Sequence, residues 1–361
     1  MHLAPARRRP AGLLASLLVG LVAVALHAAG TAAPLPKLRI TPLDASQGFP
    51  ADTHAVDINN AGQVLAYRPQ GPHFFWQPGS APVAINEPPG EFLSLAALND
   101  QGLAVGNVTG SREAPITWTA AEGLQYVALD KGLRRPKPLA VSNQGRIVGW
   151  AVSRRGGEHM INGSVRRGLH DPRPDETRES EAHAINEAGT VGGSFSLTRR
   201  CCYIATLTDR QGRVTSLGSL AGAGEVTRST VKGLNDQGQA VGSSNTASST
   251  NLHAFIWSRA SGMVDLGVSP RAIDWSVALD INQYGQVVGI HGDDEHTGTF
   301  AFYWDAEHGP MDLDTRLDPA DPLTAVTRIA DGSPRINDRG EIVTAAYVNG
   351  QLVGVLLTPT P

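Results

Sequence analysis

The sequence predicts an all-β protein, a seven-bladed β-propeller of four-stranded antiparallel blades, closed by an N-terminal strand pairing into the last blade. Three observations predict it. A unit of four short apolar runs, divided by turns and loops that carry Gly or Asn, is clearest at 279–313. The unit recurs with a period in the forties, which is typical of propeller blades. The 3.6-residue apolar stripe of helical repeats is missing.

Residues 1–32 have the three-part layout of a secretory signal peptide. Arg7, Arg8 and Arg9 precede an apolar run at 11–26, and small residues follow through Ala33. A membrane anchor is the alternative, but the run is shorter than the roughly 20 residues that span a bilayer. We expect a secreted or periplasmic protein, cleaved near 29–33, in which 33–361 is a single propeller domain without a membrane span.

The charge of the remaining chain excludes one class of partner. Loss of three arginines lowers the 30 basic residues to 27 against 34 acidic ones, a net charge near −7. Neutralising phosphates takes a concentrated basic surface, so we expect no nucleic-acid partner. We expect a monomer.

The two cysteines are neighbours, Cys201 and Cys202. Adjacent residues on a strand point to opposite faces, so a bond between them requires a strained turn. A disulfide framework is excluded, and two thiols are favoured over a vicinal disulfide.

Seven units carry the same turn between their first and second runs. Its glycines are 40, 43, 44, 49, 47 and 55 residues apart. An Asn or Ser side chain at the first position can bond its own backbone, and Gly takes the left-handed conformation, so these positions are structural. A ring of asparagines that coordinates a ligand is the less favoured alternative. The first positions are Asn59, Asn99, Ser142, Asn186, Asn235, Asn282 and Asn337.

The third run of each unit carries large aromatic residues. His253-Ala-Phe-Ile-Trp257 and Phe300-Ala-Phe-Tyr-Trp304 match position by position, and units three and four depart from the pattern at 159–162 and 202–205. Packing between neighbouring sheets explains these aromatic side chains without a ligand.

The repeats resemble a known family. An Asn-Asp-x-Gly turn, a Val-Val-Gly-like strand, His-Ala-Phe-x-Trp and Asp-Leu-Gly are similar to the extracellular repeat proteins called the HAF family, after His253, Ala254 and Phe255. The likeness covers about 52–359. The resemblance implies an exported bacterial propeller-like protein and brings no catalytic residues.

The last unit is one strand short, and an orphan strand at 38–44 precedes the repeats, which begin near 52. Pairing the two chain ends closes the ring and removes the exposed sheet edges of an open array. We therefore predict seven blades with a terminal clasp; six blades or an open arrangement are the alternatives.

The variable connections of an up-and-down meander gather on one face, where we expect binding chemistry. One loop there, with His291, Asp293, Asp294 and His296, suggests a divalent cation site, although a solvated acidic loop explains it as well. No other cofactor is expected. Linkers to the innermost strands place a second group of polar and aromatic side chains at the central mouth. These side chains form either a ligand site or a hydrated rim. They are His54, His183, Arg228, Asp274, Trp275 and Arg328.

The sequence favours a non-catalytic binding or scaffold module for a glycan, peptide or protein partner. One alternative is a polysaccharide hydrolase or lyase with carboxylates such as Glu181 in the mouth, which requires two carboxyl groups about 5 to 10 Å apart for glycoside hydrolysis. A purely structural envelope or matrix protein is the other. No nucleophile elbow, metalloprotease or nucleotide-binding motif is present.

Overall fold

The structure of the protein is a computed structural model. It describes residues 34–360 apart from 198–201, 223–227, 248–250, 270–271, 273–274, 293–297 and 331. Leu35–Pro361 forms one compact unit. The predicted signal peptide at 1–32 lies outside the described residues. Among the described residues, no helix combines the length and the apolar character needed to cross a bilayer.

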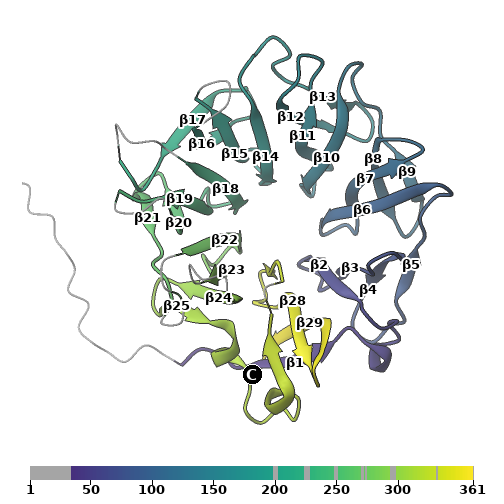
Figure 1. Ribbon diagram of the computed structural model, residues 1–361, viewed down its shortest axis with the longest axis vertical. Helices are drawn as coiled ribbons and strands as arrows, with labels where there is room; N and C mark the ends of the chain where they lie inside the picture. Colours follow the sequence, from purple (N-terminus) through teal and green to yellow (C-terminus); the bar gives the residue numbers. More distant parts are fainter. Residues whose placement is uncertain are drawn as a thin grey trace, which may run out of the picture. The chain divides into compact units, whose positions relative to one another are not determined.

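Leu35–Pro361 folds as a seven-bladed β-propeller, as predicted, with its sheets in a ring (Figure 1). Six blades are meanders of four consecutive antiparallel strands, because alternating apolar residues bury one face of each sheet against the next. Blade 1 contains β2 (His54–Ile58), β3 (Val64–Tyr67), β4 (His73–Trp76) and β5 (Val83–Ile85). Blade 2 contains β6 (Glu91–Leu98), β7 (Ala104–Gly110), β8 (Ala114–Thr119) and β9 (Gly123–Tyr126).

The next four blades repeat this order around the ring. Blade 3 contains β10 (Arg134–Val141), β11 (Arg146–Val152), β12 (Glu158–Ser164) and β13 (Gly168–His170). Blade 4 contains β14 (Ser180–Ile185), β15 (Val191–Ser196), β16 (Tyr203–Thr208) and β17 (Val214–Gly218). Blade 5 contains β18 (Ser229–Leu234), β19 (Ala240–Asn245), β20 (Leu252–Ser258) and β21 (Gly262–Asp265). Blade 6 contains β22 (Trp275–Ile281), β23 (Val287–Gly292), β24 (Thr299–Asp305) and β25 (Gly309–Asp312).

Blade 7 joins the two ends of the propeller, as the terminal clasp predicted. Its strands β26 (Thr327–Ile329) and β27 (Arg335–Ile336) both pair with β28 (Ile342–Val348), which pairs with β29 (Gln351–Pro359). The N-terminal strand β1 (Leu38–Pro42) then pairs antiparallel with β29, Leu38 opposite Pro359. Leu38 and Ile40 are buried in the core of this blade, so the strand that covers the sheet edge also adds apolar packing. Three short 3₁₀ helices occur at Ala45–Gln47, Leu313–Arg316 and Thr324–Val326.

The first-to-second turns link the blades through side-chain amides. In blade 6, the Asn282 Oδ1 accepts bonds from the backbone N–H groups of Tyr284 and Gln286, and Gly285 has a φ of 75°. Its Nδ2 donates to the carbonyl of Asn337 in blade 7, 3.0 Å away. The same link runs from Asn59 to Asn99, Asn99 to Ser142, Asn186 to Asn235, Asn235 to Asn282 and Asn337 to Asn59. We call this the asparagine circuit.

One position interrupts the asparagine circuit. Ser142 has no amide to donate, and among the described residues its hydroxyl accepts only from the Arg146 N–H, at 3.3 Å. A second circuit, the turn circuit, is complete. At the next position of each turn, the backbone N–H donates to the side-chain oxygen of the equivalent residue in the following blade. Its members are Asn60, Asp100, Asn143, Glu187, Asp236, Gln283, Asp338 and again Asn60. The structural interpretation of these turns is therefore confirmed.

The aromatic residues of the third strands pack between blades, as predicted. Phe302 of blade 6 is 2 % exposed and lies in one cluster with Val241 and Ala254 of blade 5. The histidine of the repeat bonds the aspartate of the fourth strand, because His253 Nδ1 lies 2.8 Å from Asp265 Oδ2. The recurring His and Asp are thus one structural pair.

Cys202 does not match its prediction. It forms a disulfide bond, and its φ is 71°. The expectation of a free thiol is wrong for this residue because a left-handed turn replaces the extended strand that was assumed. The other cysteine, Cys201, lies outside the described residues.

Candidate functional site at the channel mouth

The innermost strands direct polar side chains into the central channel through β-bulges. The pairing of β14 with β15 shifts between Ala182 and Ala184, and that of β18 with β19 shifts between Val231 and Gly233. The extra residues are His183 and Lys232, since a bulge re-aims the unpaired side chain. Both line a channel cavity of about 150 Å³, together with Asp57, Asp280 and Arg335.

Asp57 and Asp280 hold neighbouring blades together at this cavity. The Asp57 carboxylate accepts from the N–H groups of Ile58 and, in blade 2, Leu98, at 2.9 and 2.7 Å. Asp280 accepts from Ile281 and, in blade 7, Ile336. Burial raises the pKa of Asp57 to about 7 although Arg335 opposes this shift, and part of its surface still faces the channel. These carboxyl groups are occupied by backbone donors, which indicates a structural role.

A polar network from three blades leads from the channel to its mouth. His183 Nε2 lies 2.8 Å from Glu181 Oε2 and 3.3 Å from Lys232 Nζ. Glu158, the first residue of β12, shares a hydrogen bond with Glu181. Carboxylates of blades 3 and 4 therefore converge on an imidazole and an ammonium group.

The two carboxyl groups of this network have pKa values shifted in opposite directions. The His183 hydrogen bond holds the pKa of Glu181 down to about 2, whereas burial, reinforced by Glu181, raises the pKa of Glu158 to about 7. Burial also lowers the pKa of His183 and of Lys232. A neutral His183 that donates its Nε2–H to Glu181 cannot also accept from Lys232, so the Lys232 ammonium group interacts with Glu181 through charge attraction.

A larger pocket of about 480 Å³ opens beside this network, and we call it the mouth pocket. The rings of His54, Tyr67 and His73 stack along its wall, with centroids 5.4 and 5.9 Å apart. Leu93 and Leu95 add apolar surface, and Arg335 adds a positive charge. The wall therefore combines flat rings with one cation.

The ring of His73 is held in place by a backbone bond. The Leu95 N–H donates to its Nε2 at 3.2 Å, so Nδ1 carries the proton of the neutral ring. Burial lowers the pKa of His73 to about 4, and Nδ1 has no partner among the described residues. Buried donors normally have an acceptor, so this N–H is an exception in the packed layer behind the pocket.

Three members of the predicted ligand set line three different pockets. His54 lines the mouth pocket, His183 the channel cavity, and Arg228 a third pocket of about 130 Å³ with Glu181 and Tyr203. Trp275 begins β22 and is half-buried. Arg328 instead covers the ring of Tyr347, with its guanidinium 5.1 Å from the ring centroid. Asp274 lies outside the described residues.

Among the predicted cation ligands, only His291 can be placed. It is fully buried, and its Nε2 lies 3.0 Å from Asp312 Oδ1. Blade 5 uses His253 to bond the aspartate of its fourth strand. Blade 6 has Phe300 at that position, and His291 bonds the aspartate instead. Asp293, Asp294 and His296 lie outside the described residues, so the cation site stays a prediction. Elsewhere in the described part of the chain, no cluster of three or more metal-ligating side chains occurs.

The sequence interpretation missed Phe92, which is 68 % exposed. Phe92 pairs with Thr109 and Trp275 pairs with Gly292, at the same step of their ladders. Both aromatic residues stand seven positions before the turn asparagine, so counting back from Asn99 and Asn282 finds them. Glu158 was also missed, since its partner Glu181 belongs to another blade.

Comparisons with known proteins support the fold. Neither protein-family models nor curated protein sequences give a match. Among solved structures, prolyl endopeptidases share 12% identity with a TM-score of 0.56, over 91% of this chain and 48% of theirs. A puromycin-hydrolyzing peptidase of Mycobacterium tuberculosis shares 13% identity with a TM-score of 0.50, over 82% of this chain and 50% of its own. The chain therefore spans about half the length of these peptidases, and the likeness shows the propeller fold alone.

Proposed function

We propose that the chain is a non-catalytic binding module, which holds a glycan, peptide or protein partner at the channel mouth on its variable-loop face. The mouth pocket is the observation that carries this proposal. Its volume of about 480 Å³ lies in the range of small-ligand sites, and its wall presents apolar and polar surface in similar amounts, including three rings and the guanidinium of Arg335.

The lining indicates the chemistry of the ligand. Stacked rings at His54, Tyr67 and His73 suit a flat or apolar face, such as a sugar ring or an aromatic side chain. Arg335 favours an acidic group on the ligand. Phe92 precedes Leu93 of the lining at the start of β6, and its exposed ring offers further apolar surface on the loop face.

Glycan and peptide arrays probed with the purified chain test this proposal. A ligand found there is titrated against wild type, Phe92→Ala and Tyr284→Ala by calorimetry. Tyr284 is the matched control, because it is 75 % exposed on a first-to-second turn at the opposite face. We expect Phe92→Ala to weaken binding about tenfold and Tyr284→Ala to leave it unchanged. Equal effects of the two substitutions would sink the proposal.

Cellular location and family belong to the same proposal. The signal-like segment at 1–32 supports export to the periplasm or beyond, and the repeats at 253–257 and 300–304 support kinship with the HAF family. A purely structural envelope or matrix protein is the competing function, and arrays without any ligand would favour it.

A polysaccharide hydrolase or lyase is the second hypothesis, favoured by the opposite pKa shifts of Glu158 and Glu181. The two carboxyl groups share a hydrogen bond, which is closer than the roughly 5 to 10 Å of a glycosidase pair. This geometry favours binding over hydrolysis. Release of reducing ends or unsaturated products from a polysaccharide panel, abolished by Glu158→Gln, would reverse that preference.

A further inference from the structure

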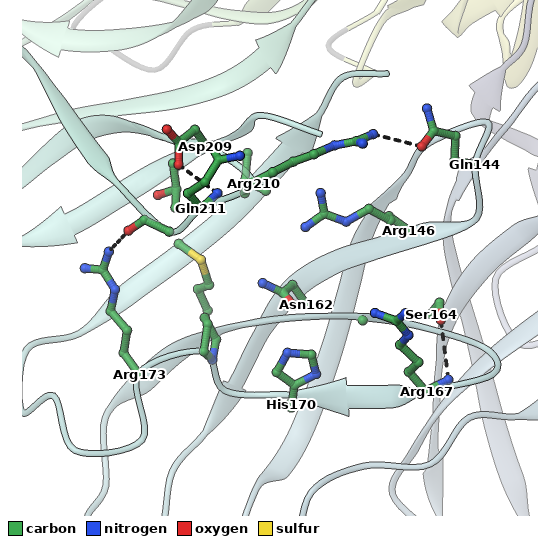
Figure 2. Close-up of a pocket in the computed structure, with 16 residues that line it drawn as sticks. Gln144, Arg146, Asn162, Ser164, Arg167, His170, Arg173, Asp209, Arg210 and Gln211 are labelled. Carbon is green, nitrogen blue, oxygen red and sulfur yellow. Dashed lines mark hydrogen bonds between the residues drawn. The ribbon is translucent and has the colours of Figure 1, made fainter. Parts of the chain in front are cut away.

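Another cavity of the protein lies away from the mouth. It is a cleft of about 850 Å³ between blades 3 and 4 (Figure 2). Its walls are the first-to-second turn of blade 3 and the third-to-fourth turns of both blades, at 142–146, 164–168 and 208–212. These turns belong to the face opposite the variable loops. The cleft is therefore separate from the mouth pocket.

Four guanidinium groups line this cleft, from Arg146, Arg167, Arg173 and Arg210, and we call it the arginine cleft. His170 joins them. In Figure 2 the side chains of Arg146 and Arg210 lie along one side, and those of His170 and Arg167 along the other. The sequence as a whole is acidic, with 34 acidic against 30 basic residues, so this concentration of positive charge is local.

The positive charge of the cleft is not neutralised within the described residues. Asp209 is the one acidic side chain that lines it, and that carboxylate is bound by Arg213 Nε at 2.6 Å. None of the ion pairs found in the described ranges includes the four cleft arginines. Like charges held together without counter-charge favour a bound anion.

Hydrogen bonds to carbonyl oxygens fix several of these guanidinium groups. Arg146 Nη1 donates to the Gly189 carbonyl at 3.1 Å, and Arg173 Nη2 donates to the Gly212 carbonyl at 2.6 Å. Arg210 Nη2 donates to Gln144 Oε1 at 2.8 Å. Since each guanidinium has five N–H donors, these bonds orient the groups and leave further donors for a ligand.

Two further features of the cleft point to a missing ligand. Burial and the neighbouring Arg210 lower the pKa of Arg146, which shows the repulsion that an anion would relieve. Thr208 also lines the cleft, and its buried hydroxyl has no hydrogen-bond partner among the described residues. Buried hydroxyl groups normally have one.

We propose that the arginine cleft binds a linear oligoanion carrying at least two phosphate or sulfate groups. Guanidinium groups recognise such oxyanions through paired N–H donors. Arginines on both sides of one cleft fit several anionic groups better than a single ion. The volume of about 850 Å³ accommodates a ligand the size of a short oligosaccharide.

Calorimetry with two probes tests the proposal on the purified chain at low salt. Tripolyphosphate carries the phosphate chemistry, a heparin-derived tetrasaccharide carries the sulfate chemistry, and neutral maltotetraose is the control ligand. We expect one or both anions to bind and the neutral sugar not to bind. The tighter of the two anions identifies the source of the ligand.

Substitutions in one turn locate the binding site. Arg167→Gln removes a cleft guanidinium, whereas Arg166→Gln removes its exposed neighbour, which does not line the cleft. We expect Arg167→Gln and Arg210→Gln each to weaken binding about tenfold, because each removes charge-assisted hydrogen bonds. Arg166→Gln and the mouth variant Phe92→Ala should change it less than about twofold.

Two results would overturn the proposal. One is the absence of binding by either anion to the wild-type chain. The other is an equal loss on Arg166→Gln and Arg167→Gln, which would mean diffuse charge attraction and no site. Because Arg167 and Arg210 are exposed, both variants should fold, and circular dichroism checks this.

Discussion

Blades 5 and 6 keep the repeat closely, whereas blades 3 and 4 depart from it. In blades 5 and 6, Asn235 and Asn282 occupy the turns, and Phe255 and Phe302 are buried between sheets. Blade 3 has Ser142 in place of the turn asparagine, and its third strand carries Ile161 where Phe would stand. The same four-stranded sheet forms in both cases.

Two charged features of the molecule coincide with these departures. Glu158 and Glu181 meet between blades 3 and 4 on the loop face, and the arginine cleft lies between the same two blades on the turn face. In the regular blades, the side chains at the repeat positions are used for packing and for the hydrogen bonds of the turns. The difference indicates that the irregular blades 3 and 4 leave charged side chains unused by the repeat, whereas the mouth pocket lies between blades 1, 2 and 7.

The largest expected effect tests how much the asparagine circuit contributes. Asn282→Ala removes two bonds to backbone N–H groups and the link to the Asn337 carbonyl, all at a residue that is 2 % exposed. We expect the free energy of unfolding to fall by about 3 kcal/mol, because buried backbone groups lose their partners. Urea denaturation followed by circular dichroism measures it.

Ser142→Ala is the matched control at the equivalent position of blade 3. Ser142 lacks the link to the next blade, and its hydroxyl accepts one long bond of 3.3 Å. We expect a loss below about 1 kcal/mol. Similar losses for Asn282→Ala and Ser142→Ala would show that the circuit does not stabilise the ring.

The second effect concerns pH and the carboxyl pair of the irregular blades. Glu158 binds its proton more tightly in the folded chain, with a pKa of about 7 against an ordinary 4.5. Its contribution to stability is therefore complete below pH 4.5 and is lost as pH rises through 7. Glu158→Gln keeps a donor to Glu181 at every pH. The free energy of unfolding of the variant, relative to that of the wild type, should therefore rise by about 1 kcal/mol between pH 5 and pH 8, after allowance for solvent screening.

Glu176→Gln is the control for this comparison. Arg178 holds the pKa of Glu176 down to about 2, so the contribution of that carboxylate is constant from pH 5 to 8 and is lost only under strongly acidic conditions. Denaturation at the two pH values measures both variants. If the difference in the free energy of unfolding between Glu158→Gln and wild type did not change with pH, the proposed proton shared by Glu158 and Glu181 would be contradicted.

The same contrast explains what the sequence could predict. Turns at Asn282 and its equivalents, and the pairing of 38–44 with the last blade, follow from local patterns that repeat along the chain. The meeting of Glu158 with Glu181, and of Arg146 with Arg210, depends on how neighbouring blades are rotated against each other. No periodic signal records that rotation, so the arginine cleft was not predicted. The environment of His291, fully buried against Asp312, also depends on tertiary packing.

The smallest effect would restore the repeat in blade 3. Ser142→Asn supplies the missing Nδ2 donor to the Asn186 carbonyl, and its Oδ1 can accept from the Arg146 N–H as in the other turns. We expect the free energy of unfolding to rise by about 0.5 to 1 kcal/mol, the net value of one added hydrogen bond. Because Arg146 stands four residues later and lines the arginine cleft, tighter closure of this turn could also shift its guanidinium. Oligoanion titration of Ser142→Asn decides whether the irregular turn contributes to binding in the cleft. Weaker binding together with higher stability would mean that the gap in the asparagine circuit is part of the site. Unchanged binding would mean that Ser142 is a neutral departure from the repeat.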